Sequence, residues 1–172
     1  MSHASNKVKW CLNKAKREIE EIGAHRGLIK AEEDKNLVEK HIIKAEHNLN
    51  AALYFDKGGF SDWSASAFFY CIYHCFLAIS RKFGYESRNQ ECTLALIEVL
   101  KEEGKLDIDD KFIDTLKITK AEEMHESSII KIREDFQYGV KIEFEKKEEF
   151  DMLAEMCKEM IEKTREIIHK NI

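Results

Sequence analysis

The sequence contains no proline and only seven glycines among its 172 residues. Because both residue types interrupt helices, a chain with so few of them can form long helices. It also shows no CxxC pair, no glycine-rich phosphate loop and no nucleophile elbow. The cysteines are five, an odd number, and we interpret them as reduced core residues of a cytoplasmic protein rather than as a disulfide framework.

The charge and the hydrophobic runs exclude further classes of protein. The net charge of −5 argues against a protein that coats nucleic acid non-specifically, although a local basic patch stays compatible with it. The N-terminus is polar and shows no secretory signal. The apolar run from Ala67 to Ile79 is shorter than the roughly 20 residues that span a bilayer, so we expect no membrane association.

The most apolar stretch, Phe60 to Tyr85, predicts a central helix, with Ser61 or Asp62 as its N-cap and Gly84 as its end. Apolar residues recur at helical spacing along one face: Ala65, Phe69, Ile72, Phe76, Ile79 and Phe83. A second face is also bulky and carries Trp63, Ala67, Tyr70, His74 and Leu77. A helix with two apolar faces is central in a bundle or shared with a second subunit, and we predict a homodimer that uses part of this stretch.

Amphipathic patterns predict further helices on both sides of the central one. They cover residues 8–22, 34–57 and 90–103, a segment from Asp107 or Asp109 to about Glu123, and 146 to the end. The predicted fold is all-α, an up-and-down bundle of four or five helices in a single domain of residues 1–172. Residues 1–33 would be an N-terminal helix and connector, and residues 34–172 the core bundle.

The stretch Ser127 to Phe144 is ambiguous between helix and strand. Its Ile, Phe, Tyr and Val content has strand character, yet some of its apolar residues fit helical spacing. We favour a short helix to about Gln137, a break at Gly139 and then an extended piece.

Metal and cofactor sites find little support. Cys71, His74 and Cys75 could share adjoining faces of a helix, but no fourth ligand is evident and a buried structural cluster is the simpler interpretation. Glu122 and His125 form a single Glu-x-x-His pair, whereas di-iron bundles need two. No metal or cofactor is therefore expected. His41 and His47, six residues apart, are assigned structural or surface roles.

Two polar groups could bind phosphate. Arg81, Lys82 and Arg88 lie beside Phe83 and Tyr85, and cations next to aromatic rings can hold a nucleotide. The alternative is a solvated helix end, where cations suit the helix dipole.

The second group is Arg133, Gln137 and Tyr138, which one helical turn would bring to one side. An arginine and a tyrosine facing a cleft can hold a phosphate and stabilise charge on it. The alternative is an arginine paired with one of the nearby carboxylates.

The sequence resembles the HEPN domains, in particular the small prokaryotic branch found beside minimal nucleotidyltransferases. The resemblance covers Asp34 to roughly Glu166. It begins with KAEHNLNAALYFDKGGFSDWSASAFFYCIYHCFLAI, which looks like the first core helix, its glycine turn and the second helix of the family. It continues with the segment from Arg133 to Tyr138, which is similar to the family's arginine motif, and with the final helix.

The resemblance implies a helical bundle that dimerises, with the arginine segments of two subunits facing one cleft. Many members are metal-independent ribonucleases, often toxins held by a nucleotidyltransferase antitoxin, and some such partners modify a tyrosine near the motif. Carried over, Arg133 would contact the scissile phosphate and Tyr138 would be that tyrosine.

One departure from the family bears on catalysis. Active members carry a histidine four to six residues beyond the arginine, where this chain has Tyr138, Gly139 and Val140. Losing this acid–base group costs about 10²–10⁴ in rate. We therefore expect the toxin-like half of a HEPN–nucleotidyltransferase pair, which binds RNA or a nucleotide at a dimer cleft with weak or absent cleavage. The alternatives are an active ribonuclease that uses Arg133 with His74 or His125 as substitute, and a helical interaction module without ligand chemistry.

Overall fold

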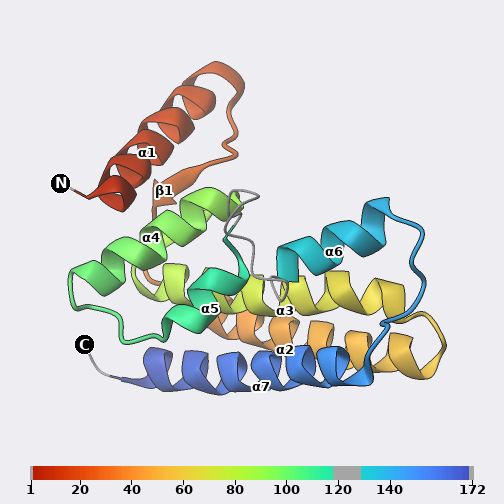
Figure 1. The fold of residues 1–172 in the computed structure, drawn as a ribbon. Coiled ribbons are helices and arrows are strands. Elements are labelled where there is room, and N and C mark those ends of the chain that lie inside the picture. The colour runs from red at the N-terminus through yellow and green to blue at the C-terminus, as the bar shows by residue number, and fades with distance from the viewer. Residues whose placement is uncertain (1, 118–128, 171–172) are drawn as a thin grey trace.

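The computed structural model describes residues 2–117 and 129–170, in which helices predominate (Figure 1). The elements in chain order are α1 (His3–Ile22), β1 (Leu28–Lys30), α2 (Lys35–Lys57), α3 (Ser61–Lys82), β2 (Tyr85–Ser87), α4 (Gln90–Glu102), α5 (Asp110–Thr115), α6 (Ile129–Tyr138) and α7 (Lys147–His169). The prediction of an all-α fold is confirmed.

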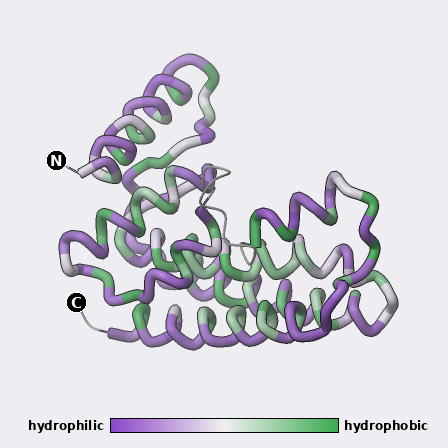
Figure 2. The backbone as a smooth tube through the Cα atoms, viewed as in Figure 1, coloured by the Kyte–Doolittle hydropathy of each residue, from purple (hydrophilic) through white to green (hydrophobic). Residues whose placement is uncertain are grey.

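Helix α3 lies at the centre and packs against α2, α4, α6 and α7. Figure 1 shows α2, α3 and α7 side by side, with α6 on the opposite side of α3 from α7. The first predicted apolar face of α3 forms the core, because Ala65, Ile72 and Phe76 are fully buried. Figure 2 shows that this helix is the most continuously apolar element, while α1 and α7 alternate between polar and apolar residues.

The start of α3 differs from the prediction. Phe60, not Ser61 or Asp62, is the N-cap residue, and no side chain caps the helix. Asp62 lies in the first turn, where its negative charge suits the helix dipole. The helix has 22 residues and is long and apolar enough to cross a membrane, but 67% of the apolar window is buried inside the protein, as in the core helix of a bundle.

A two-stranded antiparallel sheet, absent from the sequence-based prediction, joins two connectors. Leu28 of β1 lies opposite Ser87 of β2. Gly84, with a φ of 78°, precedes β2, and a Cβ there would lie 3.1 Å from the carbonyl oxygen of Ala31. A side chain at this position would therefore be strained and crowded against the backbone that follows β1. The sheet carries α1 to the outer side of α4, where Figure 1 shows it apart from the α2–α3–α7 layer.

The interpretation of all cysteines as reduced is wrong for two of them. Cys11 of α1 and Cys92 of α4 form a disulfide between residues 81 apart in the sequence, whereas Cys71, Cys75 and Cys157 are free and buried. The pairing arises because α1 packs along α4 and both cysteines face the contact between them. No spacing motif could reveal two residues that only the tertiary fold brings together.

The ambiguous stretch contains a helix, as favoured. Helix α6 ends at Tyr138, where a Cβ on Gly139 would collide with the carbonyl oxygen of Asp135. Residues 139–146 then form an irregular loop without a strand, so the expected extended piece is not part of any sheet. The helix expected to run to about Glu123 is α5, which ends at Thr115; residues 118–128 lie outside the described residues.

Candidate functional site

Arg133 of α6 lies against the central helix. Its guanidinium group sits over the ring of Phe69, 4.1 Å from the ring centroid. Phe69 is itself 3% exposed and stacks on Tyr73 at 5.9 Å with an interplanar angle of 20°. A planar cation on an aromatic platform keeps a fixed orientation, which is the arrangement that favours bidentate contacts to a phosphate.

Arg133 is not neutralised by the carboxylates near it in the sequence. It has no ion-pair partner among residues 2–117 and 129–170, and its Nε atom is buried without a hydrogen-bond partner. Gln137, one turn further, is exposed, and Tyr138 is 79% exposed. Arg133 thus lacks, among the described residues, the carboxylate partner that the alternative interpretation required. Gln137 and Tyr138 are exposed to solvent.

The open side of α3 adjoins Arg133. We define the α3 face as Trp63, Ser66, Tyr70, Tyr73 and Leu77, which lie on successive turns of one side of the helix. Trp63 is 63% exposed and Tyr70 is 48% exposed. Large aromatic side chains in this state form either a stacking platform or an unpaired subunit contact.

A histidine pair borders the other edge of this face. Nδ1 of His41 on α2 lies 3.0 Å from Nδ1 of His74 on α3. Phe69 and His74 are five residues apart, which places them about 140° apart around the helix. Arg133 and the histidine pair therefore flank the α3 face from opposite edges, and His74 does not reach Arg133 within one chain.

Both imidazoles are held neutral by their surroundings. Burial, then the neighbouring His41 and Lys44, lowers the pKa of His74 to about 4. Burial and the positive charge of Arg81 lower the pKa of His41. One neutral ring can donate its Nδ1–H to the lone pair of the other, so the pair is a hydrogen bond at pH 7.

We expect this pair to make the fold sensitive to acid. Because the folded state binds fewer protons than the unfolded chain between pH 6.5 and about 4, stability should fall as pH drops through that window. Urea midpoints at pH 7 and pH 5 should differ more for the wild type than for His74→Gln. A ring titration of His74 near pH 6.5 in NMR spectra would contradict this prediction.

The cations predicted as one cluster lie in two places. Arg81 and Arg88 both approach Glu86, at 3.9 Å and 3.0 Å, and His25 reaches the same carboxylate at 3.4 Å. Lys82 instead pairs with Glu33 at 3.2 Å. The carboxylates that they pair with lie on β2 and on the connector before α2, not on α6, so neither group is linked to Arg133 by an ion pair.

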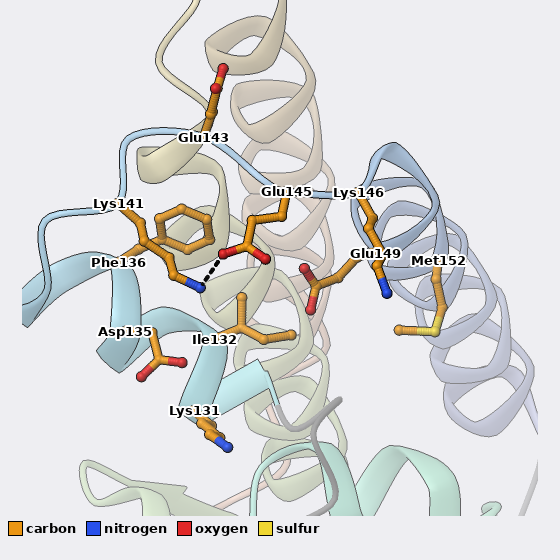
Figure 3. A pocket seen from close by; sticks show the side chains of 10 residues that line it. All are labelled: Lys131, Ile132, Asp135, Phe136, Lys141, Glu143, Glu145, Lys146, Glu149 and Met152. Atoms are coloured by element: carbon orange, nitrogen blue, oxygen red, sulfur yellow. Dashed lines mark ion pairs between the residues drawn. The ribbon is translucent and has the colours of Figure 1, made fainter.

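A pocket of about 430 Å³ lies between α6, the loop 139–146 and α7 (Figure 3). Lys141 pairs with Glu145 across it at 2.8 Å. Its charged lining is Lys131, Asp135, Lys141, Glu143, Glu145, Lys146 and Glu149. With three lysines against four carboxylates the lining is slightly acidic, which does not favour phosphate, and Arg133 is not among the lining residues.

The cysteine and histidine candidates do not converge. His74 faces α2, whereas Cys71 and Cys75 lie in the core near Cys157. A hydrogen bond with Cys157 and burial raise the pKa of the Cys71 thiol, so it stays protonated. In the described part of the chain no three His, Cys, Asp or Glu side chains are arranged to hold a metal ion. Glu122 and His125 lie outside the described residues.

Two features of the site escaped the sequence analysis. Phe69 was assigned only to the core, and His41 was considered only with His47. A signal for the histidine pair did exist, because His41 and His74 each lie about four helical turns from the glycine turn that joins α2 to α3. Antiparallel packing of α2 and α3 across that turn therefore brings the two histidines side by side.

Comparison with known proteins identifies the family of the chain. No curated protein matches the sequence at a significant level. The family model of the HEPN domain matches residues 38–170, which include α3, the Arg133 helix, α7 and nearly all of α2 but not α1. This match covers most of the chain, and the protein therefore belongs to the HEPN domain family.

Proposed function

We propose that this protein binds RNA or a nucleotide in a homodimer cleft on the α3 face, with weak or absent cleavage. Arg133 carries the proposal: it is stacked on Phe69 and unpaired within the described residues, and exposed Gln137 lies one turn further along the same side of α6. Membership of the family supports a nuclease-like or nucleotide-binding module.

A second copy of the chain would cover the α3 face. Trp63 and Tyr70 leave much aromatic surface in water, and burying such surface is worth about 25 cal/mol per Å². Pairing through this face would bring Arg133 of each subunit to the rim of one cleft. Two guanidinium groups would then face one phosphodiester, which doubles the positive charge on it.

The dimer can be tested by light scattering at micromolar concentration. We expect twice the chain mass for the wild type and the single-chain mass for Tyr70→Glu, because a buried unpaired carboxylate would oppose association. Tyr54→Glu is the matched control, since Tyr54 is 75% exposed on α2 and is not part of the α3 face. A wild type that scatters as a monomer would refute the dimer.

Little cleavage is proposed because no histidine accompanies Arg133. The motif positions hold Tyr138, Gly139 and Val140, and His74 lies on the opposite edge of the α3 face. General acid–base catalysis by a positioned histidine is worth about 10²–10⁴ in rate. An active, metal-independent ribonuclease that uses Arg133 would need a histidine from elsewhere, for example from the second subunit.

The paired partner belongs to the same proposal. Tyr138 presents its hydroxyl at the end of α6 with 79% of the residue exposed, so a minimal nucleotidyltransferase antitoxin could reach and modify it. We propose this pairing together with a cytoplasmic location and a single domain in which residues 1–33 extend the core. Mass spectrometry after co-expression with such a partner would show a nucleotide adduct on wild type and none on Tyr138→Phe.

A further inference from the structure

A second hollow lies far from Arg133, where α1, β2 and α4 meet. It has a volume of about 740 Å³ and is lined by the end of α3 as well. Phe69, the platform of Arg133, and Lys82, at the hollow, are separated by about 20 Å along α3. We call this hollow the α1–α4 groove.

The rim of the groove is positive in a chain that is negative overall. Three lysines, Lys35, Lys82 and Lys105, line it together with two carboxylates, Glu33 and Glu103. The chain as a whole carries a net charge of −5. An anion would therefore find in this groove a local attraction that contrasts with the charge of the whole chain.

The three lysines differ in their exposure and in their ion pairs. The side chain of Lys82 is only 15% exposed, and its partner Glu33 is 42% exposed. Lys105 pairs with Glu103 at 2.7 Å, with both side chains about half exposed. Lys35 has no ion pair with a described residue. The Lys105–Glu103 pair is exposed, and exposed ion pairs contribute about 0–1 kcal/mol, so a phosphate can replace Glu103 at small cost. The Lys82 side chain is mostly buried, and this figure does not extend to its pair with Glu33.

The rest of the groove is apolar and partly aromatic. Val8 of α1 and Leu96 and Leu100 of α4 contribute buried side chains, and Phe83 and Tyr85 are half-buried beside Lys82. Aromatic rings next to a cation can stack on a base while the cation holds its phosphate. The volume is within the range of sites that bury a small ligand.

The groove depends on the N-terminal helix. Val8 belongs to α1, which lies outside the residues that match the family, and the Cys11–Cys92 disulfide holds α1 on α4. The site is thus built in part by the segment that this chain adds to the family core.

We propose that the α1–α4 groove binds a nucleoside monophosphate, with the base against Phe83, Tyr85 and the apolar floor and the phosphate on Lys82 and Lys35. This site goes beyond the function proposed for the α3 face and does not involve Arg133. The same chemistry is found in a free mononucleotide and in the 5′-phosphorylated end of an RNA.

Calorimetric titration with AMP tests the proposal on the full-length protein. We expect wild type to bind AMP, and Lys82→Gln and Lys35→Gln each to weaken binding about tenfold or more, because each removes one charge from the phosphate. Because Lys35 is exposed, Lys35→Gln should not disturb the fold, and it tests the site even if Lys82→Gln misfolds. Lys131→Gln, a lysine on α6, should leave the affinity unchanged, and adenosine should bind at least tenfold more weakly than AMP.

The outcomes separate this site from the α3 face. Arg133→Ala should bind AMP as the wild type does, even if it no longer binds RNA. A 5′-phosphorylated oligonucleotide that binds more tightly than its 5′-hydroxyl form, with the difference lost in Lys82→Gln, would identify an RNA end as the ligand; equal affinities would identify the free nucleotide. Absence of AMP binding, or AMP binding that both lysine variants retain in full, would overturn the proposal.

Discussion

Arg133→Ala is expected to weaken RNA binding about 10- to 100-fold. A hydrogen bond to a charged group contributes about 1.5–3 kcal/mol, and Arg133 has no other charged partner among the described residues. The loss should appear as a higher dissociation constant in fluorescence anisotropy with a labelled single-stranded RNA. All variants must be compared at one salt concentration, because phosphate contacts are salt-dependent.

Two variants sharpen this prediction. Arg133→Lys keeps the charge but loses the planar group that stacks on Phe69, so its affinity should lie between those of wild type and Arg133→Ala. Lys131→Ala removes a cation two residues away that lines the acidic pocket of Figure 3, and it should bind RNA as the wild type does. Equal losses in Lys131→Ala and Arg133→Ala would indicate a general charge effect rather than a site.

Removal of the Cys11–Cys92 disulfide is expected to lower the free energy of unfolding by up to about 4 kcal/mol. The bond closes a loop between residues 81 apart, and the chain-entropy model assigns a value near this to loops of such length. Urea unfolding should show a lower midpoint for Cys11→Ser than for wild type without reductant. Addition of reductant should lower the urea midpoint of the wild type and leave that of Cys11→Ser unchanged.

A thiol titration of the unfolded, unreduced protein provides the independent check. We expect three reactive thiols, those of Cys71, Cys75 and Cys157, and five after reduction. Five thiols before reduction, with no effect of reductant on the urea midpoint, would show that the bond does not form. The original interpretation of all five cysteines as reduced would then apply to the protein in solution.

The long helices were predictable because their signals are local. The apolar repeat of α3, Asp34 as the N-cap of α2 and the stop of α1 at Gly23 can each be recognised within one or two turns of sequence. The β1–β2 sheet and the disulfide were not, because each joins residues that lie far apart in the chain. Three-residue strands carry too short a pattern for sequence periodicity to detect.

The site was predictable only in part, and for the same reason. Arg133 and Gln137 are one helical turn apart, so their spacing was informative by itself, whereas Tyr138 lies about 140° around α6 from Arg133. The platform under Arg133 depends on how α6 crosses α3. The division of Arg81 and Lys82 between Glu86 and Glu33 depends on how β2 and the connector before α2 flank the end of α3. These relations belong to the packing of helices, which no local pattern records.

Incubation of one labelled RNA with wild type and with Arg133→Ala in excess EDTA tests the central claim most directly. Run on native and denaturing gels, the samples should show RNA that wild type shifts and leaves essentially intact, and that Arg133→Ala fails to shift. RNA that neither protein shifts, or that both shift equally, would contradict binding through Arg133. Rapid cleavage by wild type alone would show that the chain is an active metal-independent ribonuclease despite the missing histidine.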